Sequence, residues 1–204
     1  MDLVTIATNV FETYRLFQEG HPVIGSMLTA EFVFPVADIA SQAITDRKIN
    51  LRKVAYTAAL APVYGLSSYV LMKSGDFIGD YIVDNPLAKA ALGPNLWGNM
   101  FNTFFFVNNT IGEKNNYSLA TLVGHYKNLI FGGHSFKEHY LKNIPLKEYL
   151  FATAATLTLW NVFQYWNYSS VPKELQTSAA LGASLVWMVI FSLLSLQGGR
   201  RISY

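Results

Sequence analysis

The chain has 204 residues, of which 51% are hydrophobic, 15% are aromatic and only 14% are charged. A soluble domain usually carries about 25% charged residues, so this composition, with a mean hydropathy of +0.24, indicates an integral membrane protein. The net charge of +2 is too small, and the basic residues are too scattered, to indicate a nucleic-acid partner. The absence of cysteine excludes disulfides, thiolate metal sites and cysteine nucleophiles.

The N-terminal residues do not have the composition of a cleaved targeting sequence. A signal peptide begins with a basic region, and a mitochondrial presequence is rich in arginine and poor in acidic residues. Residues 2–18 instead place apolar side chains on one helix face, which predicts either an amphipathic helix along the membrane interface or an extension of the bundle. Any targeting signal is then expected to be internal. The apolar residues are Leu3, Ala7, Val10, Tyr14 and Phe17.

Five stretches are long and apolar enough to cross a membrane. Each has about 20 residues, which covers a hydrocarbon core of about 30 Å at 1.5 Å per residue. The fourth stretch is polar and aromatic in its second half, so a re-entrant segment and four crossings are the alternative. The distribution of basic residues favours five crossings. The five stretches are about 22–45, 54–72, 88–111, 146–168 and 176–196.

These stretches predict an all-α membrane bundle that forms a single domain, residues 1–204. The long connection from 113 to 145 is expected to contain a surface helix, because apolar residues recur there with helical spacing from Leu119 to Ile130. Small residues four apart let helices approach closely in lipid, which predicts packing faces on the second and fifth stretches. The phenylalanines of the third stretch are expected to face lipid or a partner protein. The small residues are Ala55, Ala58, Ala59, Ala61, Gly65, Ala179 and Ala183, and the phenylalanines are Phe101, Phe104, Phe105 and Phe106.

Three of the stretches carry polar side chains at helical spacing, so that each set lies on one helix face. A polar group that faces lipid is costly, so these faces are expected to turn inward and form a polar seam. The rows are Glu31, Asp38 and Gln42 in the first stretch; Asn95, Asn99, Asn102 and Asn109 in the third; and Thr153, Thr156, Trp160, Gln164 and Asn167 in the fourth.

Two interpretations of this polar seam are open. In the first, the seam lines a pore or carries protons, and its asparagines solvate a water file or a permeating solute. In the second, it is a hydrogen-bond network that fixes helix packing, since asparagine is a poor helix residue unless it is hydrogen-bonded. Basic residues are scarce within the stretches themselves, and Arg52 and Lys53, at the start of the second stretch, are the nearest of these to Asp38.

No pattern in the sequence is typical of an enzyme or of a metal site. A glycine-rich phosphate loop and a nucleophile elbow are both absent. His125, His134 and His139 lie in the polar connection at a spacing that does not align them on one helix face, so they are predicted to be surface histidines. We expect no catalytic residue, no metal and no cofactor.

Two parts of the sequence carry motifs at characteristic spacing. Their residues are Tyr14, Pro22, Thr29, Asp38, Gln42, Pro62, Trp160, Gln164, Asn167, Tyr168, Val171, Pro172, Trp187 and Ser192. The C-terminal ones resemble the Trp-Pro, Gln, Asn-Phe, Val-Pro signature and the terminal Trp and Leu-Ser of a family of small organellar membrane proteins. Its members include the twenty-two-kilodalton peroxisomal membrane protein and the inner-mitochondrial protein Mpv-seventeen. The N-terminal residues resemble the family's entry motif, and the size and order of the spans agree.

The chain also departs from the family pattern. Ala37 stands where the family usually has glycine, Asn161 replaces the proline after Trp160, and Gln176 stands where an arginine is usual. The framework is thus kept while several polar and aromatic positions differ. These differences weigh against transferring a pore activity of the family to this chain.

The resemblance implies a multi-pass protein of the mitochondrial inner membrane, or alternatively of the peroxisomal membrane, without catalytic activity. The function expected is that of a structural accessory subunit of a large mitochondrial membrane complex, such as a respiratory complex or ATP synthase. The alternative is a non-selective channel for small solutes. The expected partners are the lipid bilayer with bound phospholipids and other membrane-protein subunits, and no nucleic acid.

Overall fold

Every regular element of the described residues is helical, which confirms the predicted all-α class. The computed structural model describes residues 2–82, 85–131 and 146–197. The elements in chain order are α1 (Leu3–Gly20), α2 (Pro22–Thr45), α3 (Leu51–Ile82), α4 (Pro86–Lys114), α5 (Leu119–Ile130), α7 (Leu146–Ala155), the π-helix η2 (Thr156–Trp160), α8 (Asn161–Ser170), the 3-10 turn η3 (Lys173–Leu175) and α9 (Gln176–Gln197).

The helix ends follow local sequence signals. Proline occupies the first position of both α2 and α4, where its missing N–H leaves no hydrogen bond unmade. The side chain of Asn85 accepts a bond from the backbone N–H of Leu87 before α4, and Ser118 caps α5 in the same way. Four of the five predicted stretches begin and end within a few residues of observed helices. The exception is α3, which continues to Ile82 and so extends well beyond the predicted end at residue 72.

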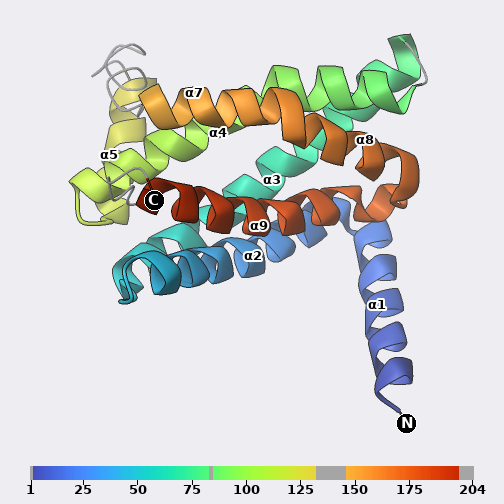
Figure 1. Cartoon of the computed structure of the whole chain (residues 1–204), viewed down its shortest axis with the longest axis horizontal. Coiled ribbons are helices and arrows are strands. Elements are labelled where there is room, and N and C mark those ends of the chain that lie inside the picture. The colour runs from blue at the N-terminus through green and yellow to red at the C-terminus, as the bar shows by residue number, and fades with distance from the viewer. Residues whose placement is uncertain (1, 83–84, 132–145, 198–204) are drawn as a thin grey trace.

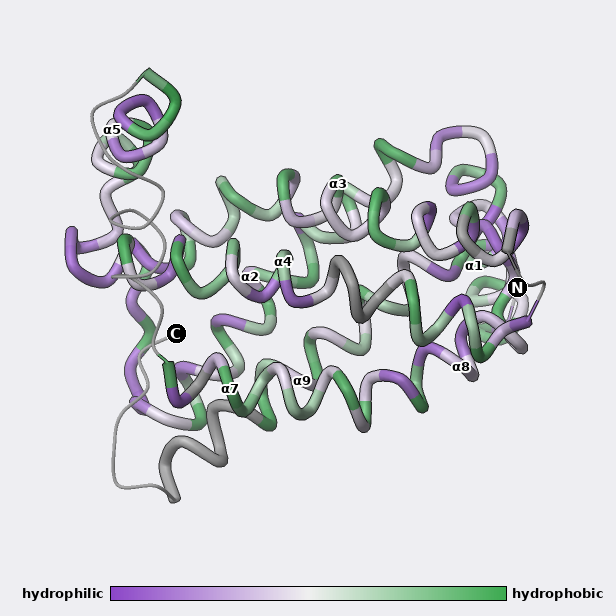
Figure 2. Tube along the Cα trace, turned by 90° about the horizontal axis from the view of Figure 1, so that it is seen from above, coloured by the Kyte–Doolittle hydropathy of each residue, from purple (hydrophilic) through white to green (hydrophobic). Residues whose placement is uncertain are grey.

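The long helices lie side by side in one bundle. α2 packs against α3 and α9, and α4 packs against α3 and against the rod made of α7, η2 and α8. Figure 1 shows that α1 projects away from one end of this bundle, while α5 lies at the opposite end. Figure 2 shows hydrophilic segments mainly towards the two ends.

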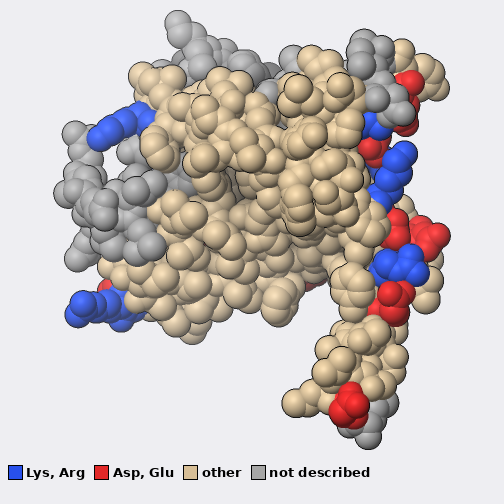
Figure 3. All heavy atoms as spheres, turned by 45° about the vertical axis from the view of Figure 1, so that its right-hand side comes forward, with Lys and Arg blue, Asp and Glu red and all other residues tan. Residues whose placement is uncertain are grey.

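Two of the described helices, α2 and α3 (over Leu51–Tyr81), are long and apolar enough to cross a membrane. The charged side chains on the face shown in Figure 3 gather almost entirely at the ends of the bundle, with a broad uncharged belt between them. Large apolar side chains are exposed along several helices, for example Phe32, Met100 and Val162. The surface of the bundle is thus unlike that of most soluble monomers, which rarely expose large contiguous apolar patches.

The predicted lipid-facing or partner-facing phenylalanines of α4 pack inside the bundle instead. Phe106 is buried, and the rings of Phe101, Phe104 and Phe105 all lie within 5.5–5.8 Å of the buried ring of Tyr64. The prediction was wrong because it considered only that these residues lie away from the asparagine row on the helix. Aromatic rings whose centroids are this close stabilise a shared core.

Glycine allows α3 to cross its two neighbouring helices closely. A Cβ at Gly65 would lie 2.7 Å from the Cα of Met27 in α2, which confirms one of the predicted small-residue contacts. A second crossing was not predicted. A Cβ at Gly93 of α4 would overlap the Cα of Gly75 in α3, and one at Gly79 would overlap the side chain of Lys89. By contrast, Ala55 and Ala59 are exposed, so they do not form the predicted face.

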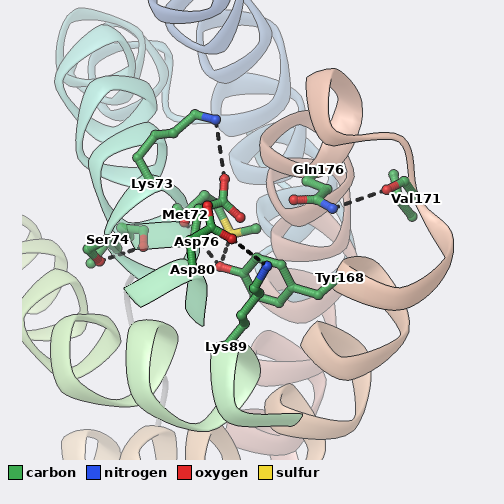
Figure 4. Close-up of polar contacts among 10 residues, drawn as sticks. Met72, Lys73, Ser74, Asp76, Asp80, Lys89, Tyr168, Val171 and Gln176 are labelled. Carbon is green, nitrogen blue, oxygen red and sulfur yellow. Dashed lines mark hydrogen bonds and ion pairs between the residues drawn. The ribbon is translucent and has the colours of Figure 1, made fainter. Parts of the chain in front are cut away.

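Polar contacts fasten the crossing of α3 and α4 (Figure 4). The Lys89 Nζ of α4 lies 3.0 Å from Asp80 Oδ1 of α3, whereas the Lys73 Nζ lies 3.2 Å from Asp76 Oδ2 within α3 itself. From α8, the hydroxyl of Tyr168 donates a hydrogen bond of 3.2 Å to the backbone carbonyl of Met72. Three helices are therefore joined at the end of the bundle where α3 extends past its predicted boundary.

The close approach at Gly93 yields a stability prediction. Gly93→Ala is expected to lower the free energy of unfolding by about 1–3 kcal/mol, because the added methyl group meets backbone that cannot move away. Gly182→Ala, in α9, is the matched control: nothing lies within 4 Å of the added Cβ, and alanine is the better helix former by about 1 kcal/mol. Denaturant unfolding in detergent, followed by circular dichroism, measures both variants. Equal stability of the two variants would contradict the crossing.

Candidate functional site

A buried ion pair joins α2 to α3. Asp38 lies in the interior, and its Oδ1 is 3.1 Å from the Nζ of Lys53, whose side chain is also buried. Thr57 Oγ1 donates a hydrogen bond of 3.2 Å to Asp38 Oδ2. One turn further along α2, Gln42 Oε1 accepts a bond of 2.6 Å from the backbone N–H of Asn50. One of the two basic residues at the start of the second predicted stretch, Lys53, is thus the partner of Asp38. Gln42 adds a contact between α2 and the residue just before α3.

A second cluster surrounds Asn108 of α4, which is completely buried. The hydroxyl of Tyr56 donates to the backbone carbonyl of Asn108 at 2.7 Å, and the hydroxyl of Tyr126 donates to Asn108 Oδ1 at 2.5 Å. Asn108 Nδ2 in turn donates to the hydroxyl of Tyr64 at 3.5 Å. Asn108 therefore connects α3, α4 and α5, so that an amide inside the core has partners for both its donor and its acceptor.

A third cluster holds the turn between α8 and α9. The Nδ2 group of Asn167 donates to Gln164 Oε1 at 3.1 Å and to the backbone carbonyl of Gln176 at 3.0 Å. Gln176 Nε2 donates to the carbonyl of Val171 at 3.1 Å, next to Pro172. Gln164, Asn167 and Gln176 are all buried. The polar residues that carry the family resemblance here fix the geometry of a turn.

A fourth cluster fastens α1 to the bundle. The hydroxyl of Tyr14 lies 2.8 Å from Thr29 Oγ1 of α2 and donates to Ser178 Oγ of α9 at 2.6 Å. The buried Gln18 donates to the same Thr29 oxygen at 3.1 Å. Tyr14 and Thr29, both from the family resemblance, are thus in direct contact. Only this end of α1 is attached in this way, while its apolar residues towards the N-terminus are exposed.

An ion pair adds to this attachment. Arg15 Nη1 lies 3.0 Å from Glu174 Oε1 in η3, and Arg15 Nε lies 2.9 Å from Glu12 Oε2. Glu174 has a lowered pKa, first because its backbone N–H bonds the carboxylate and second because Arg15 donates a hydrogen bond to it. The charged form of Glu174 is therefore favoured when α1 is in place.

A partly open cavity of about 120 Å³ lies between α2, α3, α4, α9 and the rod of α7, η2 and α8. Most of its wall is apolar and aromatic, with Phe34, Trp160 and Trp187 among the lining residues. Polar atoms are contributed by Asn102, whose Nδ2 donates to Thr156 Oγ1 at 3.1 Å. Thr156 begins the π-helix, an irregularity that occurs often at functional sites. A cavity of this size can hold a small apolar group, since a roughly 150 Å³ apolar cavity can bind benzene.

The structure divides the predicted polar rows. Glu31 is exposed, whereas Asp38 and Gln42 on the same predicted row are buried. The reason is that the buried side of α2 is centred on Ala30, Phe34 and Ala37, and one residue along a helix turns the side chain by about 100°. A position beside such a face is covered only where a neighbouring helix reaches it.

The asparagine row of α4 is divided in the same way. Asn99 and Asn102 are half-buried, and Asn102 contacts the π-helix, whereas Asn109 Nδ2 bonds to the backbone carbonyl of Phe105 in its own helix at 3.0 Å. Among the described asparagines of this helix, the completely buried one is Asn108, which the row did not include. The side chains of Asn95 and Ser192 lie outside the described residues.

The other residues singled out in the sequence lie at a helix start, within helices or on the wall of the cavity. Pro22 begins α2, and Pro62 lies within α3. Trp160 and Trp187 both line the cavity, and their ring centroids lie 6.5 Å apart. His125 is half-buried on α5, while His134 and His139 lie outside the described residues. Three or more metal-ligating side chains do not come together anywhere in the described ranges.

Sequence reasoning missed Asn108 and Gln18. A signal for Asn108 was present in α3, where Tyr56 and Tyr64 are eight residues apart and therefore share a face that offers two hydroxyls. Gln18 gave no such signal, because its burial depends on the contact of its side chain with Gly25, a glycine that leaves room for it.

Comparison of this chain with protein-family models, with curated proteins and with solved structures finds no match.

The ion pair of Asp38 and Lys53 predicts a double-mutant cycle. Lys53→Met is expected to lower the free energy of unfolding by about 3–5 kcal/mol, because it leaves a buried carboxylate without a cation. Adding Asp38→Asn is expected to restore much of this loss. Arg52→Met, at the adjacent exposed position, serves as the control. Denaturant unfolding in detergent measures the wild type, Lys53→Met, Asp38→Asn, the double variant and the control. A loss in the double variant equal to the sum of the two single losses would argue against a coupled pair.

The attachment of α1 should depend on pH. The part of the lowered Glu174 pKa that comes from Arg15 is linked to docking, because the bond from the backbone N–H of Glu174 itself does not involve α1. This part stabilises the docked form above the ordinary carboxyl range and is lost as the pH falls through about 4 and below. A spin label on a Thr13→Cys variant, in a chain with no other cysteine, should therefore become more mobile on acidification.

Glu174→Gln is expected to raise the mobility of this label at neutral pH and to remove most of its pH dependence. Glu12→Gln is the matched control, because it leaves the contact of Arg15 with Glu174 in place and should keep the pH response. A label whose mobility is the same at pH 7 and pH 3 would count against this docking contact.

Proposed function

We propose that this chain is a non-enzymatic, multi-pass membrane protein that serves as a structural accessory subunit of a large complex in the mitochondrial inner membrane. A respiratory complex or ATP synthase is the kind of assembly that we have in mind. The proposal combines the composition of the chain, the family resemblance in its motifs and the way in which its interior polar groups are used.

In this proposal α4, the rod of α7, η2 and α8, and α9 cross the membrane beside α2 and α3, and α1 lies at the interface. The charges of α4 and of the rod lie only near helix ends, and the 22-residue α9 carries none. Charge-free segments of this length fit a hydrocarbon core of about 30 Å. A peroxisomal location is the alternative, because the matching motifs occur in members from both organelles.

The observation that carries the proposal is the pairing of the buried polar residues with one another. Asp38 contacts Lys53, Asn167 contacts Gln164, and Asn108 contacts two tyrosines of α3 and one of α5. A water-filled path needs polar groups that are available to the solute, whereas these groups have protein partners that fix helix packing. Interactions with other molecules are then expected on the outer surface of the bundle.

The second candidate is a channel for small solutes, and the cavity is the observation that favours it. Asn102, Thr156 and Gln164 contribute polar groups to its otherwise apolar wall. Under this alternative, Asn102→Ala and Gln164→Ala would change the conductance of the protein in planar bilayers while the fold stays assembled.

Native electrophoresis of gently solubilised membranes tests the proposed function. We expect this chain, with its own mass of 22.8 kDa, to migrate with an assembly far larger than any small homo-oligomer. Dissociation of that assembly with a harsher detergent provides the control, because the chain should then move to low mass. Migration as a monomer or small homo-oligomer in the mildest detergent would reject the accessory-subunit function and favour the channel.

A further inference from the structure

Glu31 is a carboxylate on the outside of an apolar helix. It lies nine residues after Pro22 in the 24-residue α2, or about 14 Å along the helix axis at 1.5 Å per residue. The residue is exposed, and Figure 1 shows α2 at the edge of the bundle, beside α3 and α9. If α2 crosses a membrane, Glu31 lies near its middle.

The surface around Glu31 is apolar and open. Ile24 is 53% exposed, Leu28 51% and Phe32 71%. These residues and Glu31 lie on the same side of α2, because their spacings of three, four and seven return to one helix face. We name this surface, made of Ile24, Leu28, Glu31 and Phe32, the outer face of α2.

Charged residues are rare in the middle parts of the described helices, and Glu31 differs from the others in being exposed. The segment 54–72 of α3 carries no charge, nor do 90–112 of α4, 149–170 of the rod or any residue of α9. Asp38, the other charged residue within α2, is buried against Lys53. Across the described ranges, no side chain forms an ion pair or hydrogen bond with the carboxylate of Glu31.

The position of Glu31 requires an interaction from outside the chain. An ionised carboxylate in the middle of a bilayer costs at least about 2.5 kcal/mol, and such residues almost always face protein, where they pair with an opposite charge. A second copy of this chain would bring Glu31 against Glu31, or against the uncharged middle segments of the other helices. Since the described helices offer Glu31 no cation, a basic residue of a different polypeptide is the partner to expect.

We propose that the outer face of α2 is the docking surface for a transmembrane helix of another subunit, which presents an arginine or lysine to Glu31 near the middle of the membrane. This inference rests on the proposed function, since it supplies the contact through which an accessory subunit would be held. The apolar residues of the outer face pack against the partner helix, while the ion pair fixes its depth and rotation.

Charge variants of Glu31 test this proposal. Glu31→Gln is expected to lower the fraction of chain found in the large assembly by at least about tenfold, because the partner's cation is left unpaired in the interface. Glu31→Lys should abolish assembly. Glu113→Gln is the matched control, since Glu113 is also exposed but lies at the end of α4. The isolated variants should unfold like the wild type, because the carboxylate of Glu31 forms no hydrogen bond or ion pair with a described side chain.

Photo-crosslinking identifies the partner independently. A photoreactive amino acid at Leu28, with Glu31 left in place, should crosslink to a membrane-spanning segment of a different protein that contains a mid-membrane arginine or lysine. Exchanging that residue for glutamate should then restore assembly of Glu31→Lys. A crosslink to lipid alone or to a second copy of this chain would overturn the inference, as would a partner segment without a basic residue.

These outcomes separate the two proposals. If the wild-type chain never enters a large assembly, the accessory-subunit function is rejected, and the docking surface with it. If the wild type assembles and Glu31→Gln assembles equally well, the function stands and the docking surface is wrong. Rapid labelling of Glu31 by a hydrophobic carbodiimide within the intact assembly would also overturn the inference, because it would show a protonated carboxyl that faces lipid.

Discussion

Polar side chains inside this bundle require partners on neighbouring helices, and this constraint determines which helix faces can meet. Asp38 is buried in α2 because Lys53 and Thr57 of α3 reach it. Asn108 is buried in α4 because hydroxyls from α3 and α5 surround it. An apolar face can slide or rotate against another at modest cost, whereas an unpaired buried amide or carboxylate costs several times more. The polar contacts therefore select one arrangement from many with similar apolar packing.

The same constraint separates the interior of the protein from its surface. Inside, Asp38 and Asn108 bond to side chains of neighbouring helices, and glycines at Gly65, Gly75 and Gly93 let the helices approach closely. Outside, the helices expose apolar side chains, and α1 extends away from the bundle. A protein built in this way uses its main interior polar contacts to fix helix packing and keeps an apolar outer surface. The proposed role as an accessory subunit follows from this division.

The helices could be predicted far better than their contacts. The range 22–45 coincides with α2, and the surface helix from Leu119 to Ile130 is where periodicity placed it. The far end of α3 could not be predicted from hydropathy, because Lys73, Asp76 and Asp80 interrupt the apolar run, and these residues are accommodated by contacts to Lys89 and within the helix. Of the candidate site, Lys53 could be named as a possible partner of Asp38 because it is a basic residue at the start of the next apolar stretch, but the exposure of Glu31 could not be predicted.

The sequence by itself determined the helical class and most helix ends, because composition, proline positions and capping residues act within a few residues of chain. It also determined which residues share a helix face, since that depends only on spacing. The tertiary structure decided which of those faces is covered. Glu31 and Asp38 have similar rotational positions on α2, yet only Asp38 has a neighbouring helix beside it. Likewise Asn108 is buried while the adjacent Asn109 is only half-buried, because burial depends on helices that lie far away in the sequence and close in space.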